Sequence, residues 1–235
     1  MMLKTIITPT LVLVSVAFVC TYALTHINRL TGPRIKEQVR QKRTQDLALV
    51  LPGYSVGEEV RESVEGREFA FWEGEKEING NGVKRTARAY AFIASGTGYA
   101  DRVDSMVGVD TTGTILGISI ISQSETPGLG ARCVEVAASE TLWDVLGGST
   151  KGKGVDNAPW FQEQFGGLDA SGIKILKIGD WNPGMRQDLL GKNAITALTG
   201  ATITSQAVVK SIESGMALLK KVREIAPRAK GGGGE

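Results

Sequence analysis

The chain of 235 residues has one histidine and two cysteines. His26 and Cys20 lie in or beside a long apolar run, and Cys133 stands alone. A histidine general base, a Ser-His-Asp triad, a disulfide framework and zinc-ligand spacing are therefore excluded from the rest of the chain. A charge excess is also missing, because 27 Lys and Arg stand against 25 Asp and Glu. This balance gives no reason to expect a nucleic-acid partner.

The remaining composition is that of a globular protein, with 42% hydrophobic and 22% charged residues. The length allows one well-buried core with an appendage. Thirty glycines predict many turns and places where the backbone approaches another group closely.

The one long stretch without charge covers residues 5–25, which is long enough to cross a bilayer as a helix. Basic residues flank both of its ends: Lys4, Arg29, Arg34 and Lys36. We predict a membrane anchor over residues 1–28, because the run is long for a cleaved signal peptide. The charge bias alone favours a cytoplasmic body, but that rule is weak for long following domains, so the sequence leaves the side open.

The body is predicted to be an α+β domain with a mainly antiparallel sheet and flanking helices. Residues 29–84 should hold a basic stalk helix over 33–50 and one strand near 67–72. Period-two apolar runs predict further strands over 88–94, 103–110, 114–122 and 173–178, with a hairpin turn at 110–113. Helical spacing predicts an amphipathic helix from Ser205 to about residue 224, followed by a flexible tail over 225–235.

The stretch GGSTKGKG, residues 147–154, fits the pattern of a phosphate-binding P-loop only in part. Such a loop needs Ser or Thr after its lysine, and Gly154 stands there. The preceding residues, 141–146, also indicate a helical turn and not a strand. We therefore predict a surface loop.

The stretch SETPGLGA, residues 124–131, follows a predicted apolar strand. Pro127 and Gly128 mark a turn, and Gly130 permits close backbone approach. By itself the stretch is either a plain loop or a loop whose backbone, with Glu125 and Thr126, lines a flat ligand.

The stretch TALTGATITSQAV, residues 196–208, places four threonines and a serine without any charge before the predicted helix. Ser205 or Thr204 can cap that helix, which accounts for one or two of the hydroxyls. A helix N-terminus approached through Gly200 and Ala201 also suits a phosphate. The local pattern therefore indicates a phosphate-binding turn.

Taken together and in this order after a single apolar span, the two stretches resemble the FMN-binding domain family over about residues 85–220 and the apolar span. We therefore predict an FMN-binding domain over residues 85–224. Its members include the G subunit of the Rnf complex and the C subunit of the sodium-pumping NADH:quinone reductase. The resemblance implies one FMN, joined through its phosphate to the hydroxyl of Thr202 by a separate flavin transferase. Further residues of this motif are implied to contact the cofactor or complete the site: Thr199, Gly200, Ala201, Thr204 and Ser205.

The same resemblance implies that residues of a second group lie at the flavin ring: Glu125, Thr126, Gly128, Leu129, Gly98, Tyr99 and Lys177. Trp160 is similar to a family aromatic residue, although core packing is its favoured role. The chain departs from the family at Thr196, where members often have Asp.

The implied function is that of an electron-carrier subunit, without catalytic or metal-binding residues or independent substrate turnover. It would serve the ion-translocating ferredoxin:NAD oxidoreductase (Rnf) complex of the inner membrane, with its body on the periplasmic side. The implied partners are the other membrane subunits, the transferase and lipid. The alternatives are the C subunit of the quinone reductase and a membrane-anchored scaffold without flavin.

Overall fold

The computed structural model describes residues 2–64, 66–80, 83–135, 159–179 and 181–223. The chain divides into two compact units, residues 1–45 and residues 46–235. The helical turn and glycine loop predicted over 141–154, and the tail predicted over 225–235, lie outside the described residues.

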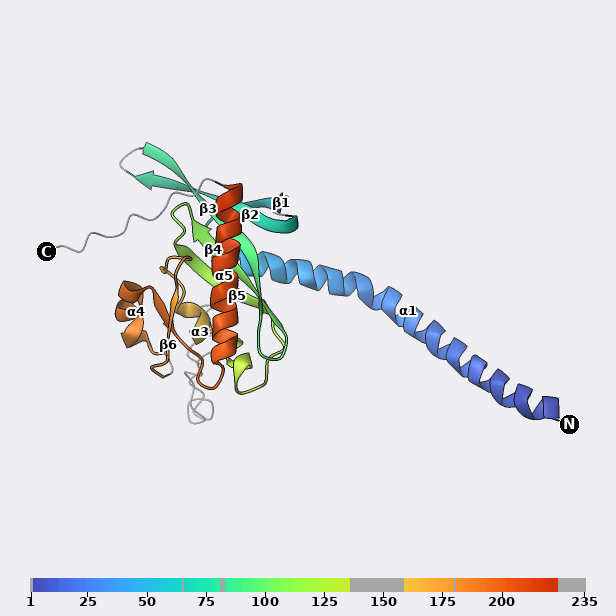
Figure 1. Cartoon of the computed structure of the whole chain (residues 1–235). Coiled ribbons are helices and arrows are strands. Elements are labelled where there is room, and N and C mark those ends of the chain that lie inside the picture. Colours follow the sequence, from blue (N-terminus) through green and yellow to red (C-terminus); the bar gives the residue numbers. More distant parts are fainter. Residues whose placement is uncertain (1, 65, 81–82, 136–158, 180, 224–235) are drawn as a thin grey trace, which may run out of the picture. The chain divides into compact units, whose positions relative to one another are not determined.

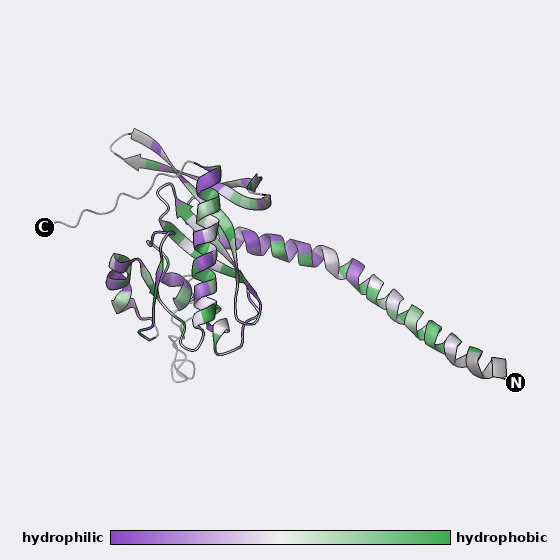
Figure 2. Cartoon of the chain, viewed as in Figure 1, coloured by the Kyte–Doolittle hydropathy of each residue, from purple (hydrophilic) through white to green (hydrophobic). Residues whose placement is uncertain are grey.

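Helix α1 (Met2–Val50) is a single helix of 49 residues. The predicted anchor and stalk are therefore both helical, but the prediction of a separate stalk helix starting near Pro33 is wrong. A proline inside a helix removes one backbone hydrogen bond, and here the helix continues through it. Apolar residues dominate the N-terminal part of α1 and polar residues its later part (Figure 2).

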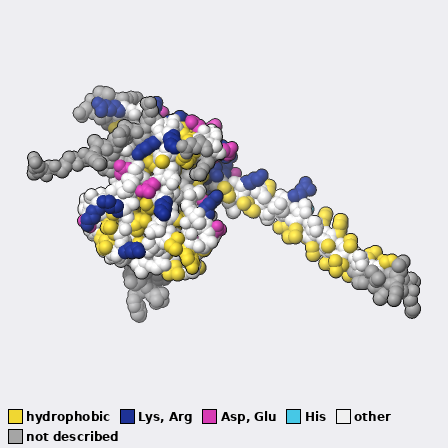
Figure 3. Space-filling view, viewed as in Figure 1, with side chains coloured by type: hydrophobic (Ala, Val, Ile, Leu, Met, Phe, Trp, Pro, Cys, Tyr) yellow, Lys and Arg dark blue, Asp and Glu magenta, His cyan; other side chains and the backbone are white. Residues whose placement is uncertain are grey.

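One helix among the described residues, the part of α1 from Thr10, is long and apolar enough to cross a membrane, with a mean hydropathy of 1.9 over its best window. Hydrophobic side chains cover this part on the face seen in Figure 3, and Lys and Arg side chains follow along the helix.

A five-stranded antiparallel sheet forms the centre of the second unit (Figure 1). Its strands pair in chain order: β1 (Ser55–Val64), β2 (Arg67–Gly80), β3 (Val83–Thr97), β4 (Arg102–Asp110) and β5 (Ile115–Ser122). The predicted strands over 103–110 and 114–122 are confirmed, while those over 67–72 and 88–94 are parts of longer strands. Strand β1 was not predicted, because four of its ten residues are charged and its side chains are partly or fully exposed. The domain boundary expected at residue 84 falls inside β3.

The hairpin between β4 and β5 turns as predicted at residues 110–113. The Asp110 carboxylate accepts hydrogen bonds from the N–H and hydroxyl of Thr112 and from the Thr114 N–H. Gly113 has a φ of +85°, which favours glycine at that position. This tight turn fixes the register that brings β5 toward the loop after Ser122.

Helix α5 (Thr202–Val222) packs across one face of the sheet (Figure 1). Its buried stripe includes Val208, Ile212 and Met216, which join the main core with aromatic residues such as Phe92. Gly96 on β3 allows close approach, because a Cβ atom there would clash with the Ala207 carbonyl. The N-terminal end of α5 is thereby held near the end of β3.

The other sheet face is covered by residues 46–51, within the second unit. Val50 and Leu51 pack with Trp72 and Met106 in a second buried cluster. Asp46 accepts a hydrogen bond of 2.7 Å from the Ser119 hydroxyl. Side chains on both faces of the central strands are therefore buried.

Two short parallel strands, β6 (Lys174–Leu176) and β7 (Ala194–Thr196), lie outside this sheet. Strand β6 confirms the centre of the strand predicted over 173–178, and β7 was not predicted. The remaining described helical segments are η1 (Gly130–Val134), α3 (Trp160–Glu163), η2 (Pro183–Met185) and α4 (Arg186–Lys192). Trp160 is buried in the main core, as its favoured interpretation predicts. Strand β7 leads directly through residues 197–201 into α5.

Candidate functional site

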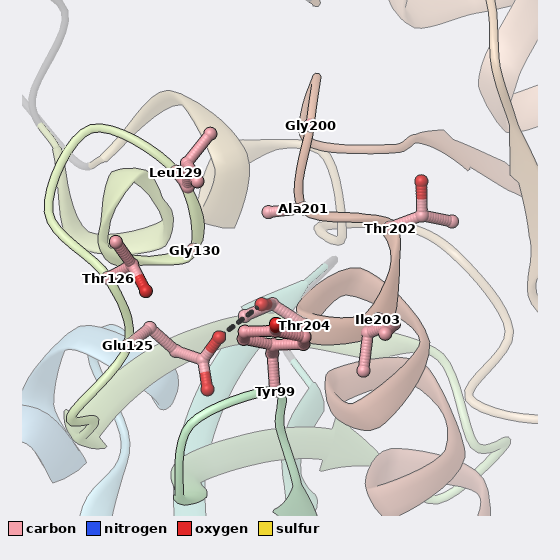
Figure 4. A pocket seen from close by; sticks show the side chains of 10 residues that line it. All are labelled: Tyr99, Glu125, Thr126, Leu129, Gly130, Gly200, Ala201, Thr202, Ile203 and Thr204. Carbon is pink, nitrogen blue, oxygen red and sulfur yellow. Dashed lines mark hydrogen bonds between the residues drawn. The ribbon is translucent and has the colours of Figure 1, made fainter.

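A cavity of about 470 Å³ lies where three segments meet: the turn after β3, the loop after β5 and the start of α5 (Figure 4). It is lined by Tyr99, Glu125, Thr126, Leu129, Gly130, Gly200, Ala201, Thr202, Ile203 and Thr204. The structure therefore brings together the two stretches that the sequence singled out, about seventy residues apart.

The Glu125 side chain joins all three segments. It is only 5% exposed, although it is a carboxylate. Its Oε2 atom accepts a hydrogen bond of 2.6 Å from the Thr204 hydroxyl, drawn as the dashed line in Figure 4. Its Oε1 atom accepts one of 3.0 Å from the Ala100 N–H. One buried acid thus holds the loop after β5 against the turn after β3 and the first turn of α5.

The turn at residues 98–101 presents its backbone N–H groups to this carboxylate. The Gly98 N–H donates to the Asp101 carbonyl at 2.9 Å, which closes the turn. Burial raises the pKa of Glu125, but hydrogen bonds from Thr204 and from the backbone at Ala100, Asp101 and Tyr99 outweigh it, so the pKa lies below its ordinary value of 4.5. Converging N–H groups favour an anion in this way, and Glu125 is ionised at neutral pH.

Two glycines make room for the acid. A Cβ atom at Gly98 would clash with Oε1 of Glu125. A Cβ atom at Gly130 would lie 2.5 Å from Oε2 and 2.7 Å from the Thr204 hydroxyl oxygen. The structure therefore places Gly98 against Glu125, and its contact with a ligand stays a prediction.

Helix α5 begins at Thr202, so the predicted start at Ser205 is wrong by one turn. Gly200, with a φ of +77°, turns the chain into the helix, and the Ala201 N–H donates to the Leu198 carbonyl at 2.9 Å. Among the described residues, no side chain caps this end. The first helical hydrogen bond runs from the Ser205 N–H to the Ala201 carbonyl, so the N–H groups of Thr202, Ile203 and Thr204 precede it.

The hydroxyls of this stretch differ in their surroundings. Thr204 is fully buried and donates to Glu125. Ser205 is also fully buried; its hydroxyl donates to the Ala201 carbonyl and accepts from the Leu198 N–H, so it holds the loop together and does not cap the helix. Thr199 is exposed and Thr202 is half-buried. The Thr202 hydroxyl points away from the Glu125–Thr204 pair (Figure 4).

Thr196 lies inside the core and not at the surface. Its side chain is fully buried on β7. Its N–H and its hydroxyl both donate to Oε1 of Gln164, at 2.7 Å and 3.0 Å. In the folded chain, Thr196 is therefore part of the support of the loop that follows it.

Three apolar side chains at the cavity are open to solvent: Tyr99 is 73% exposed, Ile203 49% and Leu129 45%. The sequence did not lead to a prediction for Ile203. The feature that could have indicated it is an apolar side chain that lies outside the buried face of α5. Gly128, with a φ of +76°, shapes the turn that positions Leu129 but does not line the cavity. Lys177 is exposed after β6 and is not among the lining residues.

Comparison with known proteins identifies the family. The family model described as FMN-binding domain matches residues 98–217, about half of the chain. The chain belongs to the FMN-binding domain family. The matched range contains every residue that lines the cavity. A second model, the RnfG N-terminal region, matches residues 1–50.

Several curated proteins are similar over most of the chain. The G subunit of the ion-translocating oxidoreductase complex of Pasteurella multocida is 27% identical, covering 91% of this chain and 94% of its own. The protein of the same name from Escherichia coli K12 is 28% identical, covering 90% of each. Among solved structures, the C subunit of the Na⁺-translocating NADH-quinone reductase from Parabacteroides distasonis has a TM-score of 0.51 and 18% identity, covering 82% of this chain and 96% of its own, which supports the α+β fold.

The cavity fits the cofactor in the family's name. Its volume lies in the range of small-molecule sites. The exposed apolar side chains of Tyr99, Leu129 and Ile203 suit a flat ring. The start of α5, with N–H groups before the first helical hydrogen bond, suits a phosphate.

Thr204→Val is expected to lower the free energy of unfolding by about 1–3 kcal/mol at neutral pH, because the ionised Glu125 loses a donor. The folded-state pKa of Glu125 is lowered, so this stabilisation is present above its ordinary pKa of 4.5 and is lost as pH falls through the lower folded value. Denaturant unfolding of the full chain in detergent should show the gap between variant and wild type at about pH 7 and a smaller gap at about pH 3. Thr204→Ser keeps the donor, so its gap from wild type should not change with pH. A gap for Thr204→Val that is independent of pH would contradict the assignment.

Proposed function

We propose that this chain is the electron-carrier subunit of a membrane-bound, ion-translocating ferredoxin:NAD oxidoreductase complex and carries one FMN. The observation that carries the proposal is the cavity at the start of α5, which lies wholly within the range matched by the FMN-binding domain family. The related G subunits support the assignment to this complex. Bound FMN would supply one- and two-electron transfer, while the protein fixes its position and surroundings.

We assign the covalent attachment of FMN to Thr202. Among the hydroxyls of the first turn of α5, those of Thr204 and Ser205 are buried and engaged within the protein, whereas Thr202 is half-buried and its hydroxyl points away from that interior. A phosphate on Thr202 would lie at the helix N-terminus, where N–H groups and the helix dipole favour negative charge. In the attachment reaction, the Thr202 oxygen would bond to the FMN phosphorus of FAD, the pyrophosphate bond would break, AMP would leave, and the hydroxyl proton would pass to a base. A separate transferase supplies the base and magnesium.

The remaining lining residues divide into two roles. Tyr99, Leu129 and Ile203 offer apolar surface to the ring, and Thr126 borders it from the loop after β5. Gly200 and Ala201 leave space beside Thr202, and exposed Thr199 precedes them. Lys177 lies outside the lining set, so we give it no part in holding the cofactor.

The N-terminal match favours this complex over the quinone reductase. The RnfG N-terminal region covers residues 1–50, and the relatives that span the chain are named as G subunits of ion-translocating oxidoreductase complexes. The resemblance to the C subunit of the quinone reductase, at 18% identity, bears on the fold alone. The partners are then the membrane subunits of the complex, the transferase during maturation and the lipid around the apolar part of α1.

Flavin attachment can be read from intact mass. Full-length protein made together with the transferase is expected to carry the mass of one FMN less one water. Thr202→Ala should abolish this addition because the acceptor oxygen is gone, and Thr202→Ser should retain it. Thr112→Ala, an exposed threonine in the β4–β5 turn, serves as the matched control and should keep full loading. Covalent flavin on the Thr202→Ala protein would refute the site, and wild type without flavin beside an active transferase would favour a scaffold.

We propose further that the second unit lies outside the cytoplasmic membrane, a location that the resemblance to the FMN-binding domain family supports. The basic residues after the apolar run oppose this placement, but charge bias governs long domains weakly. Protease added to intact spheroplasts should then digest the body and leave a cytoplasmic marker protein whole. If the second unit is cut only after detergent is added, it lies on the cytoplasmic side and the proposed placement is wrong.

A further inference from the structure

We propose that Glu125 holds a fixed negative charge at the wall of the FMN cavity and thereby lowers the reduction potential of the cofactor. Thr204 and the turn at residues 98–101 position this charge. The inference rests on the proposed function, because it takes the cavity as the flavin site. It concerns a property of the site that binding alone does not require.

The charge at the cavity is unbalanced. Glu125 is the one charged side chain among the lining residues that the structure describes. A cavity built only to bind an anionic cofactor would gain from a lysine or arginine at its wall. Here the N–H groups at the start of α5 suit the phosphate, and the Glu125 carboxylate lines the cavity. The carboxylate therefore disfavours additional negative charge on the flavin ring.

The titratable groups around Glu125 do not neutralise it. On the turn, the Asp101 carboxylate accepts the Arg102 N–H, while the Arg102 side chain pairs with Asp104. The first turn of α5 contributes only hydroxyls and apolar groups.

On η1 and just after it, Arg132 pairs with Glu135 at 3.2 Å and lies over the ring of Trp160. Burial, followed by the charge of Glu125, raises the pKa of the Cys133 thiol to about 12, so this thiol stays neutral. The two arginines, Arg102 and Arg132, therefore pair with other carboxylates, Asp101 adds a second negative charge, and Glu125 is held by neutral donors.

The size of the shift that Glu125 causes in the reduction potential depends on how many protons the flavin takes up with its two electrons. Two electrons taken up with one proton leave the flavin ring with one added negative charge, whereas two electrons with two protons leave none. A nearby carboxylate opposes the first outcome and hardly affects the second. At an effective dielectric of 20, a charge about 10 Å away lowers the equilibrium constant for uptake of two electrons and one proton on the order of tenfold. This corresponds to about 30 mV for a two-electron couple.

The test is a spectroelectrochemical titration of the full-length, flavin-loaded protein in detergent. Glu125→Gln should raise the midpoint potential by about 30 mV at about pH 9, and the difference should shrink toward zero at about pH 5.5, where Glu125 is still ionised but the reduced ring takes a second proton. Glu125→Asp keeps the charge and should stay near wild type. Glu68→Gln removes an exposed carboxylate on β2 and should change nothing.

A Glu125→Gln potential equal to that of wild type at both pH values would overturn the proposal, and so would an equal shift in Glu125→Asp, which would indicate a role in packing alone. If Glu125→Gln does not fold, the pH dependence of the reduction potential of the wild-type protein still tests the proposal. Its plot of potential against pH should change slope at a higher pH than that of free FMN, because the carboxylate favours the neutral reduced ring. A slope change at or below that of free FMN would contradict the inference.

Intact mass separates the two proposals. If the protein carries no covalent flavin, the proposed function is contradicted. If it carries covalent flavin but Glu125→Gln does not shift the reduction potential, only the role of Glu125 is contradicted.

Discussion

A carboxylate buried away from water must be given hydrogen-bond donors, and the site depends on how Glu125 obtains them. They come from the backbone of a turn about 25 residues earlier and from the Thr204 hydroxyl 79 residues later. The sheet brings the turn into place, and the packing of α5 brings Thr204. Gly98 and Gly130 are needed because the acid occupies the space that their side chains would fill. The cavity exists because these three segments are held to one group.

This constraint also assigns the hydroxyls at the start of α5. Thr204 is committed to Glu125 and Ser205 to the loop at Leu198 and Ala201, so neither presents its oxygen to an outside reagent. Among the hydroxyl residues of the first turn of α5, Thr202 is the one whose side chain is only half-buried. On the proposed assignment, the folding that buries Thr204 and Ser205 leaves Thr202 as the FMN acceptor of this turn, near the carboxylate of Glu125.

The sequence predicted those parts whose signal is local. The alternation of β4 and β5 and the helical stripe of α5 follow from side-chain periodicity, and the α+β class follows from them. Strand β1 and the distal parts of β2 and β3 were not predicted, because they carry many charged and exposed side chains. Strand β7 was not predicted, because three residues are too few to show a periodic pattern. The start of α5 was misplaced because Thr204 and Ser205 have the residue types of helix caps, while their partners, Glu125 and Leu198, meet them only in the folded chain. The prediction that the two motifs share one site rested on the resemblance to the family. Spacing could not supply it, because no local rule brings residues 79 positions apart into contact.

The central proposal, that FMN is attached to Thr202, is tested most directly by tandem mass spectrometry of the flavin-loaded protein. Cleavage after Lys192 and Lys210 releases residues 193–210 as one peptide, which contains Thr196, Thr199, Thr202, Thr204 and Ser205. The account predicts that fragment ions carrying the flavin phosphate begin at Thr202 in the N-terminal series, with unmodified ions up to Ala201. A modification on Thr204 or Ser205 would contradict it, because those hydroxyls are buried and engaged with Glu125 and Ala201.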